Sequence, residues 1–459
     1  MAVIKKVALF CAVFSLVLPF YGYAGQMDIR EEINLLKQRI GVLEQRLAEQ
    51  DKCIDDQKQC IVEQDRKISE YESKLSQFDA DLHRQTGSPI SIAEGLEIGA
   101  GATLIVQGSN NVNNPSSDAE KKTSRTDGSY STDITLAKEF SEIEGRAFLH
   151  LENGQSQGVE DSLTLYSNVN RDADDDVNVR VTEVWYEQGI FKDKAAVTFG
   201  KLDPTAYFDN NEVANDETTQ FLGRIFRNAP TIDFPDNTLG IRLAYLPKEW
   251  VELGYGIFNA SGSWKKINDN LFNIGQVTFK TNFFERAGNY RFYGWNNAAY
   301  YTKWLDSEKT KESAYGFGLS FDQKVSDVIT AFLRYGWQDP SVYNPEISTI
   351  AGGLNYSLEQ SWSSGLQFEG KPWGRENDVL AFAVGQIFPS GDYKKAGALL
   401  DPARRAKPEG HLEAYYRIFV NKYLSLSPDF QYIWNPFGKD VPEDTEGVFV
   451  GGMRAQVDF

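Results

Sequence analysis

The stretch VFVGGMRAQVDF, Val448–Phe459, has a period of two: apolar or small residues alternate with others along its length. Successive side chains of a β-strand point to opposite faces, so this period predicts a strand with one apolar face. That face carries Phe449, Gly451, Met453, Ala455, Val457 and Phe459. A single alternating segment fits any half-buried sheet, so the fold depends on how often the pattern returns.

The same period recurs upstream in many segments. It is clear in SIAEGLEIGAGATLIVQG (Ser91–Gly108), DVITAFLRYGW (Asp327–Trp337) and HLEAYYRIFV (His411–Val420). We count about sixteen such segments of roughly ten residues, the length of a membrane-spanning strand. Some connections are tight, such as Pro247-Lys248-Glu249, whereas others are long and rich in Asn and Asp, such as Asn153–Asp176.

A soluble β-sandwich also alternates, but four features together favour a transmembrane barrel. The strands are long and numerous, and short turns occur among long polar loops. Tyr (22), Phe (29) and Trp (9) are abundant, as interfacial girdles require. The last strand ends on Phe459, a feature that outer-membrane barrels present to their assembly machinery. We predict an all-β transmembrane barrel of about sixteen antiparallel strands over residues 87–459, closed because an open sheet edge cannot face lipid.

Two different elements precede the barrel. Residues 1–24 carry Lys5 and Lys6, an apolar run Val7–Phe20 and small residues near Ala24, which predicts a signal peptide rather than a membrane anchor. Residues 25–86 follow a seven-residue repeat over eight heptads, which predicts an α-helical coiled coil that joins subunits. One core position holds Ile33, Ile40, Leu47, Ile54, Ile61, Ile68, Leu75 and Leu82. The other holds Ile29, Leu36, Leu43, Gln50, Gln57, Gln64, Tyr71 and Phe78.

Cys53 and Cys60 lie beside the core seam of this coil. In an oxidising compartment they would form disulfides between chains; the alternative is a pair of free surface thiols. The buried Gln layers fix the register and the number of strands at a cost in stability.

Composition and motifs exclude several classes of function. The net charge is −18, whereas contact with nucleic-acid phosphates needs a basic patch; we expect no nucleic-acid partner and no phosphate-selective pore. His83, His150 and His411 are scattered, and no HExxH or GxSxG motif occurs. We therefore expect no enzyme: no catalytic residues, no cofactor and no metal site.

One segment breaks the two-residue period. From Glu217 to Arg227 the spacing is helical, and a short amphipathic helix in a barrel loop can fold into the lumen. We predict that this loop narrows a water-filled channel. The predicted lining residues are Tyr207, Asp209, Glu212, Glu217, Gln220, Arg224 and Arg227. The alternative is a surface loop that covers the barrel mouth or contacts a neighbouring subunit.

Two blocks carry a family resemblance. GKLDPTAYFDNNEVANDETTQFLGRIFRNAPTIDFP (Gly200–Pro235) and HLEAYYRIFVNKYLSLSPDFQYIWNPFG (His411–Gly438) with the GGMRAQVDF ending resemble the carbohydrate-selective porins of the OprB family. The resemblance covers Ile90–Phe459 and leaves out the coiled coil, which is an added element. It implies a sixteen-stranded outer-membrane barrel for passive diffusion of sugars. Related porins are often trimers, which favours a three-stranded coil.

The resemblance leads to a full set of expectations. The permeants are small sugars and other small solutes, the barrel contacts outer-membrane lipid as a homotrimer, and the coiled coil lies in the periplasm, where peptidoglycan is within its reach. Two alternatives stay open: a general or ion-conducting porin, and a structural trimeric outer-membrane anchor with a plugged barrel.

Overall fold

The computed structural model describes residues 37, 40, 41, 95–114, 124–192, 194–283, 285–345, 349–350, 354–402, 404, 406–440 and 447–459. The chain divides into two units, Met1–Ile92 and Ala93–Phe459. In the first unit Lys37, Ile40 and Gly41 are helical. The predicted signal peptide, the remainder of the predicted coiled coil and both of its cysteines lie outside the described residues.

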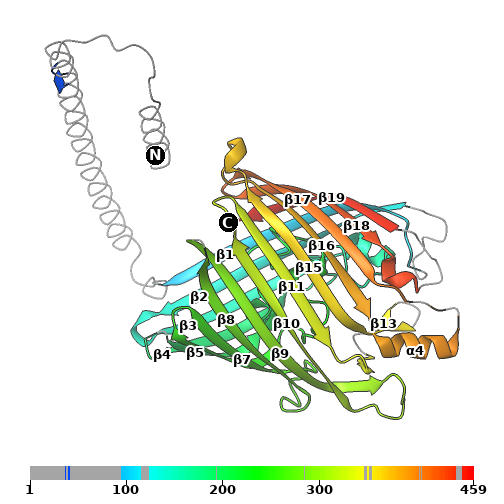
Figure 1. Ribbon diagram of the computed structural model, residues 1–459. Helices are drawn as coiled ribbons and strands as arrows, with labels where there is room; N and C mark the ends of the chain where they lie inside the picture. The colour runs from blue at the N-terminus through cyan, green and yellow to red at the C-terminus, as the bar shows by residue number, and fades with distance from the viewer. Residues whose placement is uncertain are drawn as a thin grey trace, which may run out of the picture. The chain divides into compact units, whose positions relative to one another are not determined.

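The second unit is a closed barrel of sixteen antiparallel strands (Figure 1), as the sequence predicts. The wall consists of β1 (Leu96–Asn110), β2 (Ser124–Phe140), β3 (Gly145–Gln155), β4 (Arg180–Ile190), β5 (Ala195–Leu202), β6 (Thr238–Lys248), β7 (Val251–Asn259), β8 (Leu271–Phe283), β9 (Arg286–Lys303), β10 (Glu312–Lys324), β11 (Ile329–Gln338), β15 (Leu358–Glu369), β16 (Val379–Pro389), β17 (Glu409–Asn421), β18 (Leu424–Trp434) and β19 (Gly447–Asp458). The last strand pairs with the first, from Gly101 opposite Asp458 to Ser109 opposite Val450.

Shorter elements lie in the loops. They are β12 (Val342–Tyr343), β13 (Thr349–Ile350), β14 (Leu354–Asn355), α3 (Arg224–Arg227) and α4 (Gly391–Leu400). Among the described residues, none of the helices is both long enough and apolar enough to cross a membrane.

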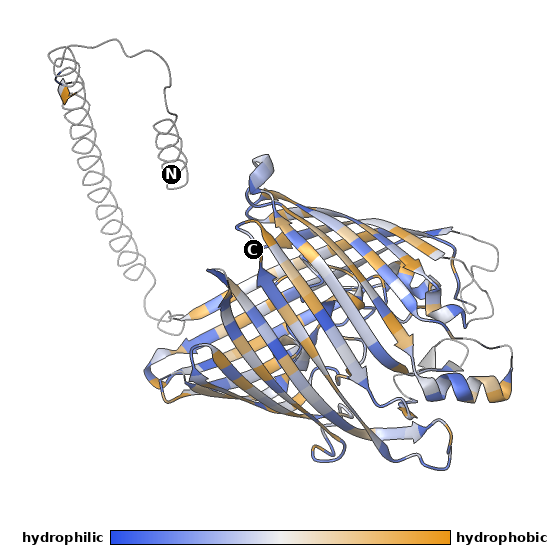
Figure 2. Ribbon diagram, viewed as in Figure 1, coloured by the Kyte–Doolittle hydropathy of each residue, from blue (hydrophilic) through white to orange (hydrophobic). Residues whose placement is uncertain are grey.

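The strands place their apolar side chains outside. In β19, Phe449 and Met453 are 46% and 45% exposed. Arg454, which follows Met453 and lies on the opposite face of the strand, is 1% exposed. Figure 2 shows the resulting bands of hydrophobic and hydrophilic residues around the wall. Outward-facing apolar side chains stay exposed even where they contact neighbouring rings, as Phe449 contacts Tyr432, so the outer surface is suited to lipid.

The two ends of the barrel differ in the length of their connections. Residues 249–250 join β6 to β7, and residues 422–423 join β17 to β18, whereas residues 203–237 join β5 to β6. The start of β1 and the end of β19 lie at the short-turn end. In barrels of this type short turns face the periplasm and long loops face the exterior. Two of the long loops, residues 156–179 and 203–237, turn inward; we call them the β3–β4 loop and the β5–β6 loop.

Candidate functional site: a lumen narrowed by two loops

A buried ion pair fixes the first half of the β5–β6 loop. The Arg334 side chain on β11 donates from Nε to Asp209 Oδ1 at 3.1 Å and from Nη2 to the carbonyls of Asp209 and Ala214 at 2.9 and 3.0 Å. The backbone N–H of Ala229 donates to the other carboxylate oxygen at 2.7 Å. Burial raises the pKa of Asp209, and the Arg334 guanidinium opposes that rise. Arg334 Nη1 also donates to the Phe226 carbonyl at 2.5 Å, so one arginine joins three points of the loop to the wall.

Two further wall residues hold the middle of the loop. Glu413 on β17 accepts the backbone N–H groups of Leu222 and Gly223 at 2.6 and 2.9 Å. Arg454 on β19 donates to the carbonyls of Glu217 and Gln220 at 2.7 and 2.8 Å. Charged groups make the stronger class of hydrogen bond, so these contacts define the path of the loop across the lumen.

These contacts correct our prediction of a helix from Glu217 to Arg227. Only Arg224–Arg227 is helical. Before Arg224, Glu413 binds the N–H groups of Leu222 and Gly223 and Arg454 binds two carbonyls, while the Gln220 N–H still donates to the Asp216 carbonyl at 2.8 Å in a single turn. Gln220 Oε1 also accepts the N–H groups of Asn215 and Asp216 at 2.7 and 3.2 Å. Tertiary hydrogen bonds to charged partners therefore replace the helical ladder.

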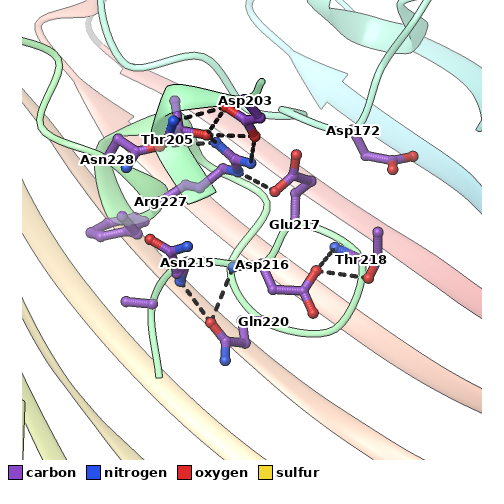
Figure 3. Close-up of polar contacts among 12 residues, drawn as sticks. Asp172, Asp203, Thr205, Asn215, Asp216, Glu217, Thr218, Gln220, Arg227 and Asn228 are labelled. Carbon is purple, nitrogen blue, oxygen red and sulfur yellow. Dashed lines mark hydrogen bonds and ion pairs between the residues drawn. The ribbon is translucent and has the colours of Figure 1, made fainter. Parts of the chain in front are cut away.

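The loop presents a charged group to the lumen (Figure 3). Arg227 is bonded to Glu217, lies 3.8 Å from Asp203 and donates to Thr205 Oγ1 at 3.0 Å. The side chains of Arg227 and Glu217 are 14% and 20% exposed. Water reaches them, and their charges are paired with each other.

The β3–β4 loop packs beside the β5–β6 loop. Glu409 on β17 accepts the backbone N–H groups of Tyr166 and Ser167 at 3.0 and 2.8 Å. The N–H of Arg171 donates to the carbonyl of Leu222 at 2.9 Å, which joins the two loops. The Asp172 carboxylate next to it accepts from the Ser131 hydroxyl at 3.0 Å.

The electrostatics of this second loop centre on Asp172. Burial raises the pKa of Asp172 to about 8, the nearby charge of Glu217 adds to the rise, and the Ser131 hydrogen bond opposes it. The Asp172 carboxyl therefore titrates close to neutral pH. The neighbouring Glu217 side chain is accessible to water.

The wall opposite the loops carries aromatic rings and paired charges. Phe148 on β3 and Trp185 on β4 stack with ring centroids 4.9 Å apart. His150 Nε2 lies 2.8 Å from Asp133 Oδ1. Arg242 on β6 lies over the Tyr207 ring at 4.6 Å from its centroid. These side chains are partly exposed, so water reaches them, although Trp185 and Tyr207 also pack against the apolar cluster that includes Phe208, Ala229 and Ile232 of the β5–β6 loop.

The predicted lining residues fall into different environments. Glu217, Arg227 and Tyr207 are half-buried beside the lumen, and Arg224 is half-buried at its long-loop end. The Glu212 side chain is 64% exposed and 3.7 Å from Arg291. Gln220 is half-buried and bonded within the loop.

Asp209 has the opposite environment. It has no exposed surface, and a group that water does not reach cannot line a channel. Its carboxylate is instead committed to Arg334 and Ala229. We therefore assign Asp209 as an anchor of the loop.

Sequence reasoning did not single out Phe148, Asp172, Trp185 or Arg242. A signal was present in the strands, because Arg146, Phe148, His150 and Glu152 share the inward face of β3. The alternation showed which face was polar, but not that two loops fill the other side of the barrel and leave this face open.

A closed antiparallel barrel with an apolar exterior and loops folded into its lumen defines the class: it is a porin-type outer-membrane channel. The family model described as "Carbohydrate-selective porin, OprB family" matches residues 130–459, and the chain belongs to that family. It is an outer-membrane porin for the diffusion of sugars, and our identification from the sequence is confirmed.

Individual relatives are distant. The high-pH structure of Pseudomonas putida OprB superposes with a TM-score of 0.65 over 82% of this chain and 97% of that chain, at 16% identity; this is a likeness of fold. An uncharacterized protein of Aquifex aeolicus (strain VF5) is 22% identical over 271 residues, which is 59% of this chain and 67% of the relative.

Proposed function

We propose that sugars cross between the two inward loops and the wall formed by β2, β3, β4 and β6. On the loop side Glu217 and Arg227 border the path, with Tyr207, Glu212, Gln220 and Arg224 toward its ends. On the wall side Phe148 and Trp185 border it. The observation that carries this proposal is the partial exposure of Arg227 and Glu217, 14% and 20%, on a loop that is otherwise tied to the wall.

Neutral sugars suit this lining better than ions do. Arg227 is paired with Glu217, and His150 with Asp133, so the path offers hydrogen-bonding charges without a large field of one sign. Sugar hydroxyls exchange hydrogen bonds with such groups, while aromatic rings offer an apolar face. A channel of this kind selects by width and by the groups at its narrowest ring.

Solute influx separates the proposal from its alternatives. The full chain is reconstituted in liposomes, and influx of glucose, amino acids and potassium chloride is compared. We expect rapid glucose influx. Equal permeability to charged and neutral solutes would favour a general or ion-conducting porin, and no influx of any solute would favour a structural anchor.

The lining assignment has its own test. Replacing Arg224 and Arg227 by Ala should widen the channel or change which solutes it admits, because both arginines border the proposed path. Unchanged glucose influx together with unchanged single-channel conductance would overturn the assignment.

We further propose that the assembled protein is a homotrimer joined by a periplasmic coiled coil over residues 25–86, after removal of residues 1–24. Eight heptads support the coil. Contact of this coil with peptidoglycan belongs to the same proposal. Non-reducing electrophoresis of the native protein, compared with a Cys53→Ser/Cys60→Ser variant, tests the interchain disulfides; mass measurement in detergent tests the trimer.

A further inference from the structure

An arginine lies at the junction of the two inward loops. The backbone N–H of Arg171 in the β3–β4 loop donates to the Leu222 carbonyl of the β5–β6 loop at 2.9 Å. The next residue, Asp172, accepts from the Ser131 hydroxyl on the inward face of β2 at 3.0 Å. Leu222 and Ser131 are both buried in the barrel interior. The Arg171 backbone is therefore fixed inside the barrel, and its exposed side chain meets water there.

The Arg171 guanidinium is uncommitted. Its N–H groups make no hydrogen bond or ion pair with any of the described residues. The nearby Arg227, by contrast, is bonded to Glu217 and Thr205, and its side chain is 14% exposed. Arg227 must break these bonds before it can bind a passing solute, which costs free energy. Arg171 offers five N–H donors without that cost.

The charges around Arg171 favour an anion. Burial lowers the pKa of Arg171 most, and repulsion from Arg227 and Arg224 comes next. Attraction to Glu217 and Asp203 opposes this fall, each by a smaller amount. Arg227 is itself bonded to Glu217 and lies 3.8 Å from Asp203. A solute that brings a negative charge to Arg171 relieves the repulsion between the arginines.

The carboxylates of the facing wall do not offer an equivalent site to a cation. Asp133 Oδ1 on β2 lies 2.8 Å from His150 Nε2, and Glu187 Oε2 on β4 lies 3.3 Å from Arg242 Nη1. Both carboxylates therefore have a partner in the wall, whereas the Arg171 guanidinium has none among the described residues. A guanidinium binds a carboxylate with two parallel N–H···O bonds.

We propose that Arg171 is an anion subsite of the channel, and that through it the channel admits sugar acids of the uronate class as well as neutral sugars. The proposal rests on the proposed function of sugar passage. The carboxylate of the sugar acid accepts hydrogen bonds from Arg171, while its hydroxyls use the lining that neutral sugars use. A simple ion has no hydroxyls and gains only the first of these contributions. Arg171 thus distinguishes sugar acids from amino sugars of the same ring size.

Influx of three sugars with one ring size tests the proposal: glucuronate is an anion, glucose is neutral and glucosamine is a cation. The full chain in liposomes is assayed at about pH 6.5, with potassium and valinomycin to discharge the membrane potential. The Asp172 carboxyl, with a pKa of about 8, is then mostly uncharged. We expect glucuronate to enter at least as fast as glucose and several-fold faster than glucosamine. This comparison in the wild-type protein needs no variant.

Two substitutions assign the preference to Arg171. Arg171→Gln keeps a hydrogen-bonding side chain but removes the charge. It should slow glucuronate influx about fivefold and change glucose influx by less than about twofold. Arg171→Lys keeps the charge and should retain most of the glucuronate influx. The matched control is Arg125→Gln, which removes the same charge from an exposed arginine of β2 that is already bonded to Asp127; it should not change the ratio of glucuronate to glucose influx.

The outcomes separate this inference from the proposed function. If the wild-type protein admits glucose but excludes glucuronate, or if Arg171→Gln keeps the wild-type ratio, the inference is wrong and the proposed function stands. An equal fall of the ratio in Arg125→Gln would assign the effect to overall charge and also overturn the inference. If the wild-type protein admits none of the sugars, the proposed function is wrong and the subsite falls with it. Heat-modified electrophoretic mobility checks the folding of each variant.

Discussion

The two sides of the barrel interior have the same strand geometry but opposite contents. On β17, the inward residues Glu409, His411 and Glu413 are 0% exposed, because the inward loops cover them. On β2 and β4, the inward side chains of Asp133 and Glu187 are 27% and 30% exposed. Charged residues therefore serve two purposes inside one wall: on one side they bind loop backbone, and on the other they face water.

Side-chain size separates the two sides as clearly as charge does. A Cβ atom added to Gly336 on β11 would lie 2.1 Å from Thr231 Oγ1, and one added to Gly385 on β16 would lie 2.7 Å from Ile225 Cδ1. Both glycines make room for the β5–β6 loop. The opposite wall instead carries the stacked Phe148 and Trp185.

The largest effect is expected from breaking the anchor of the filled side. Arg334→Met leaves the fully buried Asp209 carboxylate without its cation, which costs about 3–5 kcal/mol. The loop should leave the wall, and single-channel conductance in planar bilayers should rise several-fold. An Asp209→Ala/Arg334→Met double variant removes both charges and should lie closer to wild type. If the single variant keeps the wild-type conductance, the remaining contacts hold the loop unaided.

A smaller effect should follow from filling the space that the loop occupies. Gly336→Ala forces Thr231 away from β11, and overpacking of this kind costs about 1–3 kcal/mol. Barrel closure should persist, while the channel becomes noisier because the loop is less firmly held. Gly451→Ala is the control, since nothing lies within 4 Å of an added Cβ there. Equal current noise in the two variants would contradict close packing at Gly336.

On the side of the barrel that the loops leave open, a substitution should change the rate of solute influx more than the stability of the protein. Trp185→Ala removes the ring that stacks on Phe148, and aromatic contacts of this kind contribute about 0.5–1.5 kcal/mol. We expect the half-saturation concentration for glucose influx to rise about three- to tenfold, with a thermal midpoint close to wild type. Trp250→Ala on the exterior is the control. A large loss of stability without a change in influx would place Trp185 in the structural framework instead.

The smallest expected effect is a change of ion selectivity with pH. The pKa of Asp172 is raised to about 8, so the carboxyl is neutral below this value and gains a negative charge as pH rises through it. The ratio of potassium to chloride permeability should increase between about pH 7 and 9, and Asp172→Asn should remove the step.

The sign of the accompanying stability change is also fixed. Since the folded protein holds this proton more tightly than the unfolded chain, the contribution of Asp172 to stability should decline as pH rises from about 4 to about 8. A selectivity step that persists in Asp172→Asn would assign the titration to another group.

The fold followed from the sequence because a period of two is a property of each strand alone. Leu104 and Val106 share the apolar face predicted for their segment and are exposed on β1. A shift of the strand register by one residue would have turned both side chains to the inner face of the barrel. The number of strands followed from counting such segments.

The site followed only in part. The charged residues near Arg227 marked the β5–β6 loop as unusual, yet the role of Asp209 depends on Arg334, which is 125 positions away. The helix begins only at Arg224, later than predicted, because Glu413, about 190 positions away, binds Leu222 and Gly223. Spacing within a segment carries no information about such partners. Phe221, Ile225 and Phe226 form the apolar side of this amphipathic segment, and all three are buried.

The position of Arg454 links assembly to selectivity. Its two hydrogen bonds to the carbonyls of Glu217 and Gln220 come from β19, the strand that also closes the wall against β1. Until β19 has paired with β1, the β5–β6 loop lacks its hydrogen bonds to Arg454, and the channel lacks one of its boundaries. A partly assembled barrel would therefore be less selective, because the strand that closes the wall also completes the constriction.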